Sequence, residues 1–212
     1  MKASVLLEGM DPLTPADFFS VHKELPCKCM TAIPDLSLLL NEESFASLYL
    51  RWDEEGIQGK LDVRKPFETS LFPEYSKGDC IELFLDTRDN KRSCVISRFC
   101  HRFLVFGGEV QGLQAQEITR LRPDEERPLC DPADLGVERV VAETGYTLLF
   151  TLPRHALHGY NPYEFSRIGF AYQVHRFGGK PQQFPFSAKQ FAPWQYPNLW
   201  ASFTLTTVGK KS

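Results

Sequence analysis

The carboxylates of one short stretch, KGDCIELFLDTRDN at residues 77–90, are the first candidates for chemistry on this chain. Glu82 stands inside an apolar run, and Asp86 and Asp89 follow in a polar turn. A carboxylate on a strand either faces solvent or accepts hydrogen bonds from a ligand. The acidic oxygens of the turn suit solvation or a structural calcium ion, although the spacing of an EF-hand is missing. No other cofactor is indicated.

The histidines and cysteines form no recognisable metal or nucleophile motif. His155 and His158 lie three residues apart, but no third ligand stands at metal spacing and no HExxH is present. A GxSxG motif is also missing. His101 shares an alternating row with Phe99 and Phe103, which is typical of a buried histidine. The six cysteines lack a CxxC…CxxC zinc pattern, so we read them as mostly reduced, with a disulfide framework as the alternative.

An aromatic stretch near the C-terminus, FPFSAKQFAPWQYPNLW at residues 184–200, suits binding to a flat apolar ligand. Its prolines restrict the backbone, so a ring such as that of Trp194 can be held out at a small ordering cost. A Trp presented in this way offers a face to a sugar ring. The alternative is that these rings cover one end of the fold.

Composition excludes several classes of function. A net charge of −3 and a pI near 6.0 argue against nucleic-acid or membrane-surface binding, which needs a basic face. No segment is apolar over the roughly 18 residues that cross a bilayer. The start, MKASVLLEGMDPL, is too short and too interrupted for a signal peptide, so we expect a cytoplasmic protein.

The elements that must position these side chains are predicted to be β-strands. Residues 47–63 alternate apolar and polar side chains around a turn at 54–56, which indicates a hairpin with one buried face. The same period of two recurs in 80–86, 97–106, 145–152, 167–175 and 199–207. We therefore predict an all-β protein, an antiparallel β-sandwich with residues 46–207 as a single domain. Residues 1–45, punctuated by prolines, are predicted to be an irregular N-terminal arm that packs on the core.

The order of these segments resembles the family 9 carbohydrate-binding modules and related single-domain bacterial sandwiches. SLYLRWDEEGIQGKLDV resembles the early hairpin of the family, and GDCIELFLDTRDN is similar to its most recognisable strand. GYTLLFTLPRHAL with RIGFAYQVHR is similar to the later strand pair. The closing WQYPNLWASFTL is similar to the last segment of these modules. The resemblance covers roughly residues 45–206 and implies a jelly-roll or immunoglobulin-like sandwich.

The resemblance also implies a set of site residues. Trp194 matches the ring that stacks on the sugar, and Glu82 matches the carboxylate that bonds sugar hydroxyls. Arg102 is the nearest candidate for an arginine that points into the same site, and His101 is the next. The second stacking Trp is missing, and Tyr75 lies close to its place.

The predicted function is therefore non-catalytic binding of a carbohydrate or polyol, through aromatic stacking and carboxylate or arginine hydrogen bonds. One alternative is a structural or protein-interaction sandwich that has lost sugar binding and has a protein partner. A second is an enzyme associated with glycoside hydrolysis. No catalytic set is visible in the sequence, so a non-enzyme is favoured.

Overall fold

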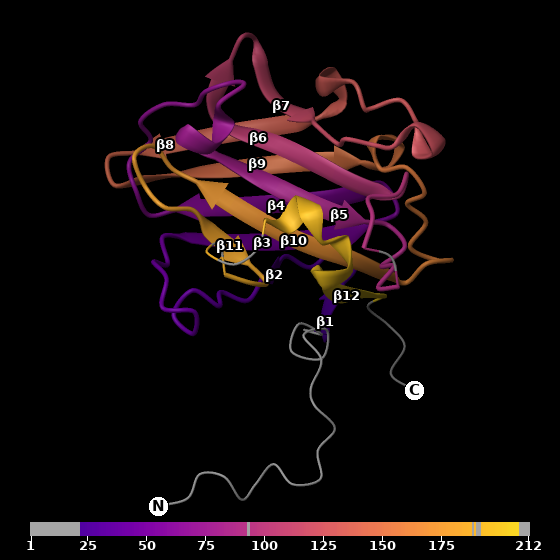
Figure 1. Ribbon diagram of the computed structural model, residues 1–212. Coiled ribbons are helices and arrows are strands. Elements are labelled where there is room, and N and C mark those ends of the chain that lie inside the picture. Colours follow the sequence, from indigo (N-terminus) through magenta and orange to yellow (C-terminus); the bar gives the residue numbers. More distant parts are fainter. Residues whose placement is uncertain (1–21, 93, 188, 190–191, 208–212) are drawn as a thin grey trace, which may run out of the picture.

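Two β-sheets packed face to face make up the protein, as a computed structural model shows (Figure 1). The structure describes residues 22–92, 94–187, 189 and 192–207. Its strands are β1 (His22–Pro26), β2 (Thr31–Ala32), β3 (Ala46–Asp53), β4 (Gly56–Val63), β5 (Cys80–Asp86), β6 (Cys100–Val110), β7 (Leu113–Glu117), β8 (Gly136–Ala142), β9 (Gly145–Pro153), β10 (Arg167–His175), β11 (Gln182–Phe184) and β12 (Ala201–Thr206). Short 3₁₀ helices connect them: η1 (Tyr75–Lys77), η2 (Pro123–Glu125), η3 (Pro132–Asp134), η4 (Arg154–Ala156), η5 (Pro193–Gln195) and η6 (Pro197–Leu199). None of these described helices is long and apolar enough to cross a membrane.

The strand order confirms the predicted all-β sandwich. The larger sheet runs β1-β12-β10-β5-β6-β7, with β11 paired to β10, and the smaller runs β2-β3-β4-β9-β8. Neighbouring strands of both sheets are antiparallel, apart from the parallel pair β1 and β12. The predicted hairpin at 47–63 is β3 and β4, paired from Ala46–Val63 to Asp53–Gly56.

Part of the N-terminal segment that was predicted to be irregular is built into the sandwich. β1 pairs with β12 in the larger sheet, and β2 pairs with β3 in the smaller. Both strands are short, and β1 gains its partner 180 residues away along the chain (His22 with Ser202). The sequence gives no alternation of apolar and polar residues by which these strands could be recognised, because the segment is short and interrupted by prolines. The partner strand of β1 is also remote in the sequence.

The main apolar core lies between the two sheets and follows from the period of two. In β3, Leu48, Leu50 and Trp52 are each 1% exposed, while the residues between them are half-buried. Successive side chains of a strand point to opposite faces, so one row enters the core. The indole Nε1 of Trp52 donates to the backbone oxygen of Leu25 in β1, 2.5 Å away, and so ties the N-terminal strand to the core.

The outer face of the larger sheet is covered as well, by two smaller apolar clusters. One joins Phe84 of β5 to Trp200 beneath the C-terminal segment, and the other joins Cys80 to Leu104 and Phe106 near η1. Figure 1 shows the C-terminal segment, in yellow, crossing the face of β10. Consequently every residue of β5 is buried, on both of its faces. Between the two clusters the sheet carries the polar side chains of Glu82, Arg102 and His175, of which Glu82 contacts the other two.

Candidate functional site

A hollow of about 460 Å³ opens on the outer face of the larger sheet, between the C-terminal segment and the wall formed by β6. Four of the predicted site residues line it: Tyr75 from η1, His101 and Arg102 from β6 and Trp194 from η5. These residues come from three separate parts of the chain. The sandwich therefore brings together most of the side chains that the resemblance implied.

Arg102 forms the floor of this hollow and is held there by specific contacts. Its Nε donates to Oε2 of Glu82 at 2.8 Å, and its Nη2 donates to the Tyr75 hydroxyl at 2.7 Å. Its guanidinium carbon lies 5.7 Å from the ring centre of Tyr75 and 5.6 Å from that of Trp194, within the range of a cation–π contact. Its Nη1 has no hydrogen-bond partner among the described residues, so two N–H groups of a fixed arginine remain for a ligand.

Glu82 lies beneath Arg102 and not in the open hollow, which differs from its predicted role as a direct ligand contact. Its side chain is 3% exposed, and Nε2 of His175 lies 2.6 Å from Oε1 while Arg102 occupies Oε2. Burial alone would raise the pKa of Glu82, but His175 and Arg102 outweigh burial and lower it. An ionised Glu82 therefore orients Arg102 through a charge-assisted hydrogen bond.

Trp194 is held on the rim by the apolar cluster under it. It is 44% exposed, whereas the neighbouring Trp200 is 1% exposed and packs against Phe84 at 5.8 Å between ring centres. The Nε1 of Trp200 donates to the backbone oxygen of Pro193 at 2.8 Å, next to Trp194. Trp200 therefore covers the sheet, which was one of the two predictions for the aromatic stretch, and it anchors the turn that leaves Trp194 exposed.

His101 borders the hollow along β6, but its side chain points into the protein. It is 0% exposed, its ring stacks on Phe103, and its Nδ1 lies 3.0 Å from Oε1 of Glu117. Arg102 and His101 are successive residues of one strand, so they occupy opposite faces. His101 is therefore a buried histidine, as its alternation with Phe99 and Phe103 predicted, and it does not reach the site as a sugar-binding group.

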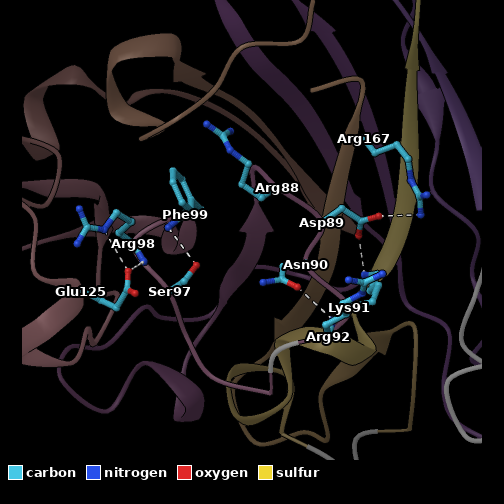
Figure 2. Close-up of a pocket in the computed structure, with 10 residues that line it drawn as sticks. All are labelled: Arg88, Asp89, Asn90, Lys91, Arg92, Ser97, Arg98, Phe99, Glu125 and Arg167. Atoms are coloured by element: carbon cyan, nitrogen blue, oxygen red, sulfur yellow. Dashed lines mark hydrogen bonds and ion pairs between the residues drawn. The ribbon is translucent and has the colours of Figure 1, made fainter. Parts of the chain in front are cut away.

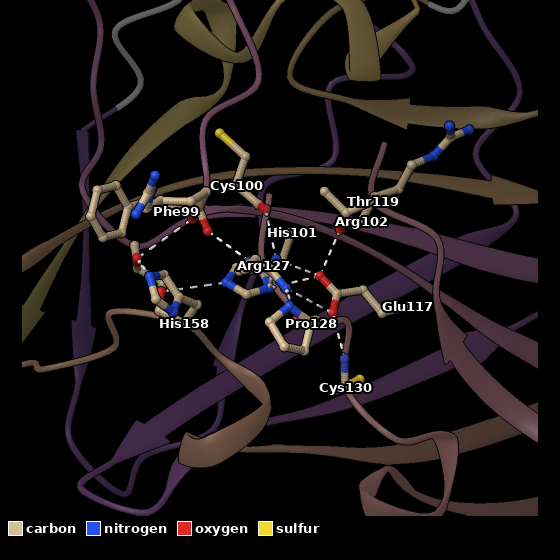
Figure 3. Close-up of polar contacts among 12 residues, drawn as sticks. Phe99, Cys100, His101, Arg102, Glu117, Thr119, Arg127, Pro128, Cys130 and His158 are labelled. Carbon is tan, nitrogen blue, oxygen red and sulfur yellow. Dashed lines mark hydrogen bonds and ion pairs between the residues drawn. The ribbon is translucent and has the colours of Figure 1, made fainter. Parts of the chain in front are cut away.

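Glu117 and Arg127 complete a buried polar cluster around His101 (Figure 3). Arg127 contacts both carboxylate oxygens, with Nη2 2.6 Å from Oε1 and Nη1 3.2 Å from Oε2. The Thr119 hydroxyl donates to Glu117 at 2.7 Å and accepts from the backbone N–H of Arg102 at 2.8 Å. The cluster therefore fastens the connection between β7 and β8 against β6, on the side of the hollow.

Comparison with solved structures shows the fold. A family 9 carbohydrate-binding module from Caldicellulosiruptor kristjanssonii, in complex with cellotriose, matches over 90% of this chain and 96% of its own, with a TM-score of 0.63 and 13% identity. A module from the same organism in complex with glucose matches with a TM-score of 0.61 and 14% identity, over 91% of this chain and 98% of its own. The chain has a fold like that of these modules. A Bacteroides uniformis protein matches with a TM-score of 0.51 and 9% identity, over 88% of this chain and 98% of its own.

The comparisons extend no further than the fold. No protein-family model matches this sequence, and no curated protein does. At 13% and 14% identity, likeness to the two modules carries no residue roles on its own. The side chains of the hollow must therefore be judged from their own geometry.

Several residues in and beneath the hollow were not predicted as site residues. His175 supports Glu82, and Arg120 and Arg122 line the hollow from the connection between β7 and β8. His175 ends a clearly alternating strand, so its face could have been assigned from the sequence. The position of Arg120 and Arg122 could not, because a long connection without regular structure gives no periodic signal.

A second, larger hollow of about 720 Å³ lies around the turn after β5 (Figure 2). Its charged groups are largely paired with one another: Asp89 contacts Lys91 at 2.7 Å and Arg167 at 2.9 Å, and Arg98 contacts Glu125 at 3.1 Å. Among the described residues that line it, none carries an exposed ring comparable to that of Trp194. Charges that are already neutralised offer little to a ligand, so we do not assign this hollow as the functional site.

The same turn does not fit the calcium ion considered from the sequence. Both oxygens of Asp86 accept backbone N–H groups, from Arg88 at 2.9 Å and Asn90 at 2.7 Å. Asp89 contacts two cations, whose positive charge opposes a third. Within the described residues no cluster of three or more His, Cys, Asp or Glu side chains is arranged to hold a metal. A structural calcium ion elsewhere on the chain stays a prediction.

Proposed function

We propose that this protein binds a carbohydrate in the hollow between Trp194 and β6, without altering it chemically. The observation that carries the proposal is the convergence of an exposed indole, a hydroxyl and a fixed guanidinium on one hollow. A sugar presents an apolar ring face and a rim of hydroxyls, which match a flat aromatic and a few fixed polar groups. The fold shared with modules solved with glucose and cellotriose supports this class of ligand.

In this proposal each residue has a separate task. Trp194 stacks on the sugar ring, and Tyr75 stands as the second aromatic wall. Arg102 donates hydrogen bonds to ring hydroxyls, while Glu82 and His175 hold Arg102 in place from below. Each contact contributes about 1 kcal/mol, so a few of them give micromolar or weaker affinity.

The thiol on the wall of the hollow is not activated as a nucleophile. Cys100 lines the hollow, and burial raises its pKa to about 11. A thiol with such a pKa is protonated at neutral pH and is a poor nucleophile. The proposal accordingly gives Cys100 no role as a nucleophile.

The proposal also includes a cytoplasmic location. Its support is that all six cysteines are free: Cys27, Cys29, Cys80, Cys94, Cys100 and Cys130. Disulfides are rare in a reducing compartment. Fractionation of source cells, followed by detection with an antibody, tests this part, and recovery in an exported fraction would reject it.

The test of binding is calorimetric titration with glucose and cellotriose on the protein and on Trp194→Ala. We expect the variant to lose at least about ten-fold in affinity, because the stacking face is removed, while its circular dichroism is unchanged. Tyr163→Ala is the matched control, since Tyr163 is 70% exposed and lies outside the hollow.

Three results would reject the proposal in different ways. Equal affinity of Trp194→Ala and the unaltered protein would place sugar binding elsewhere. No binding across a broad glycan array, together with recovery of a stoichiometric protein partner, would favour an interaction module. Turnover of aryl glycosides that is lost on Glu82→Gln would favour the enzyme alternative.

A further inference from the structure

Three guanidinium groups surround the proposed carbohydrate site, and no carboxylate faces it. Arg102, Arg120 and Arg122 all line the hollow, whereas no Asp or Glu is among its described lining residues. The carboxylate of Glu82 lies below the floor, where Arg102 and His175 neutralise it. The hollow is therefore positively charged in a protein whose net charge is −3.

The two outer arginines are available to a ligand. Arg120 is exposed and has no hydrogen-bond or ion-pair partner among the described residues. Arg122 contacts Asp124 at 3.6 Å, with both side chains more than half exposed. An exposed pair at that distance contributes little, so a bound anion can replace it.

The hydrogen-bonding groups of the hollow are predominantly donors. Guanidinium groups only donate, and the Tyr75 oxygen already accepts from Arg102, which leaves its O–H to donate. The Thr119 hydroxyl is occupied on both sides, by Glu117 and by the backbone N–H of Arg102. Each sugar hydroxyl can accept from these donors but also has a hydrogen of its own to donate, and the hollow offers few acceptors for it besides the amide oxygen of Gln195. An anionic oxygen only accepts, so it suits a donor-rich hollow better than a neutral hydroxyl.

We infer that the ligand of this site is an acidic saccharide, with its ring on Trp194 and its anionic group between Arg120 and Arg122. This inference rests on the proposed carbohydrate binding. A carboxylate or phosphate supplies acceptor oxygens for these donors, and guanidinium groups pair with both. A uronic acid or a sugar phosphate has this chemistry.

The buried Glu117 cluster contributes by fixing the segment that carries both arginines. Arg127 lies five residues after Arg122 and is anchored on Glu117 and on the backbone oxygen of Cys100 at 3.1 Å. Thr119, directly before Arg120, is anchored on Glu117. The connection is thus fastened on both sides of Arg120 and Arg122, which reduces the ordering cost when they bind an anion.

The experiment is calorimetric titration at pH 7 with methyl glucuronide, glucose 6-phosphate, methyl glucoside and inorganic phosphate. We expect one of the two acidic sugars to bind about ten-fold more tightly than methyl glucoside at about 20 mM salt. This preference should shrink several-fold at about 300 mM salt, because exposed charges are screened. The two acidic arms distinguish a carboxylate from a phosphate ligand.

The double variant Arg120→Gln with Arg122→Gln should lower the affinity for the acidic sugar to that for methyl glucoside. Binding of methyl glucoside should change far less than binding of the acidic sugar. Arg154→Gln is the matched control, because Arg154 is exposed and lies outside this hollow. It should keep the preference intact.

Three outcomes would overturn the inference. Equal affinity for acidic and neutral sugars, lost in Trp194→Ala, would leave the proposed carbohydrate binding standing and remove only the acidic class. Binding of inorganic phosphate as tightly as either acidic sugar would show that the ring contributes nothing. Failure of every sugar to bind would reject the proposed function together with the inference.

Discussion

The molecule contains two clusters of the same composition, Glu82–Arg102–His175 and Glu117–Arg127–His101. In each, a buried glutamate contacts an arginine and a histidine. The arginine of the first is 14% exposed and faces a hollow between two aromatic rings, whereas that of the second is 6% exposed and contacts backbone oxygens. The two clusters therefore differ not in residue type but in whether the arginine has N–H groups left to donate to a ligand.

The difference arises from what covers each cluster. Over Arg102, the C-terminal turn and η1 stand apart and leave room for a ligand. Over Arg127, the connection between β7 and β8 closes against β6. The backbone carbonyls of Arg98, just before β6, and of Cys100, at its start, accept the guanidinium N–H groups. A guanidinium whose N–H groups are all hydrogen-bonded within the protein stabilises the fold. A guanidinium that is fixed in orientation but keeps free N–H groups is suited to binding a ligand.

The largest expected effect comes from breaking the closed cluster. Arg127→Met leaves the Glu117 carboxylate buried without its main counter-ion, so the free energy of unfolding should fall by about 3–5 kcal/mol. Urea unfolding followed by circular dichroism measures this change.

Arg98→Met is the control for that experiment, because the Arg98 side chain is 43% exposed in its pair with Glu125. Its loss should cost less than about 1 kcal/mol. Similar losses in the two variants would show that burial does not distinguish these arginines.

Acid should act on the same closed cluster. Burial alone would raise the pKa of Glu117, but His101 and Arg127 lower it to about 2, and burial lowers the pKa of His101. In both cases the unfolded chain binds protons at a higher pH than the folded one, so stability falls as pH falls. The Glu117 contribution is complete above about pH 5 and is lost towards pH 2, a change of about 3 kcal/mol.

Unfolding by urea at a series of pH values from about 7 to 3 checks this prediction. Glu117→Gln should flatten the acid dependence, since the titrating group is gone. Glu143→Gln, on an exposed carboxylate of the turn between β8 and β9, should leave it unchanged. An unchanged slope in Glu117→Gln would mean that other carboxylates control the acid response.

The sandwich itself could be predicted because burial alternates along long antiparallel strands. β3, β4 and β10 each show that alternation or a continuous apolar run in the sequence. β1 and β2 could not be found, because their partners are remote and their own lengths are short. Local pattern is informative only where the buried face repeats within one segment.

The site was predictable in part, for a related physical reason. Alternation separates His101 from Arg102 but does not say which face is open, and β5 is covered on both. Hence the sequence placed Glu82 in the hollow, whereas the structure places it under Arg102. The positions of Arg120 and Arg122 in the long connection depend on the hydrogen bonds of Thr119 and Arg127 to Glu117, and no local sequence pattern reveals these contacts.

Of the two clusters, the open one gives the smaller expected change in stability, in Arg102→Met. Glu82 keeps His175 as a partner at 2.6 Å, and water from the hollow can reach the vacated oxygen, so the free energy of unfolding should fall by only about 1 kcal/mol. Binding of the saccharide should fall at least about ten-fold, because its floor donor is lost. Unfolding and titration of one preparation measure both changes. A stability loss as large as that of Arg127→Met, with binding retained, would contradict this prediction. It would mean that Arg102 stabilises the fold as Arg127 does and that the ligand binds without contacting it.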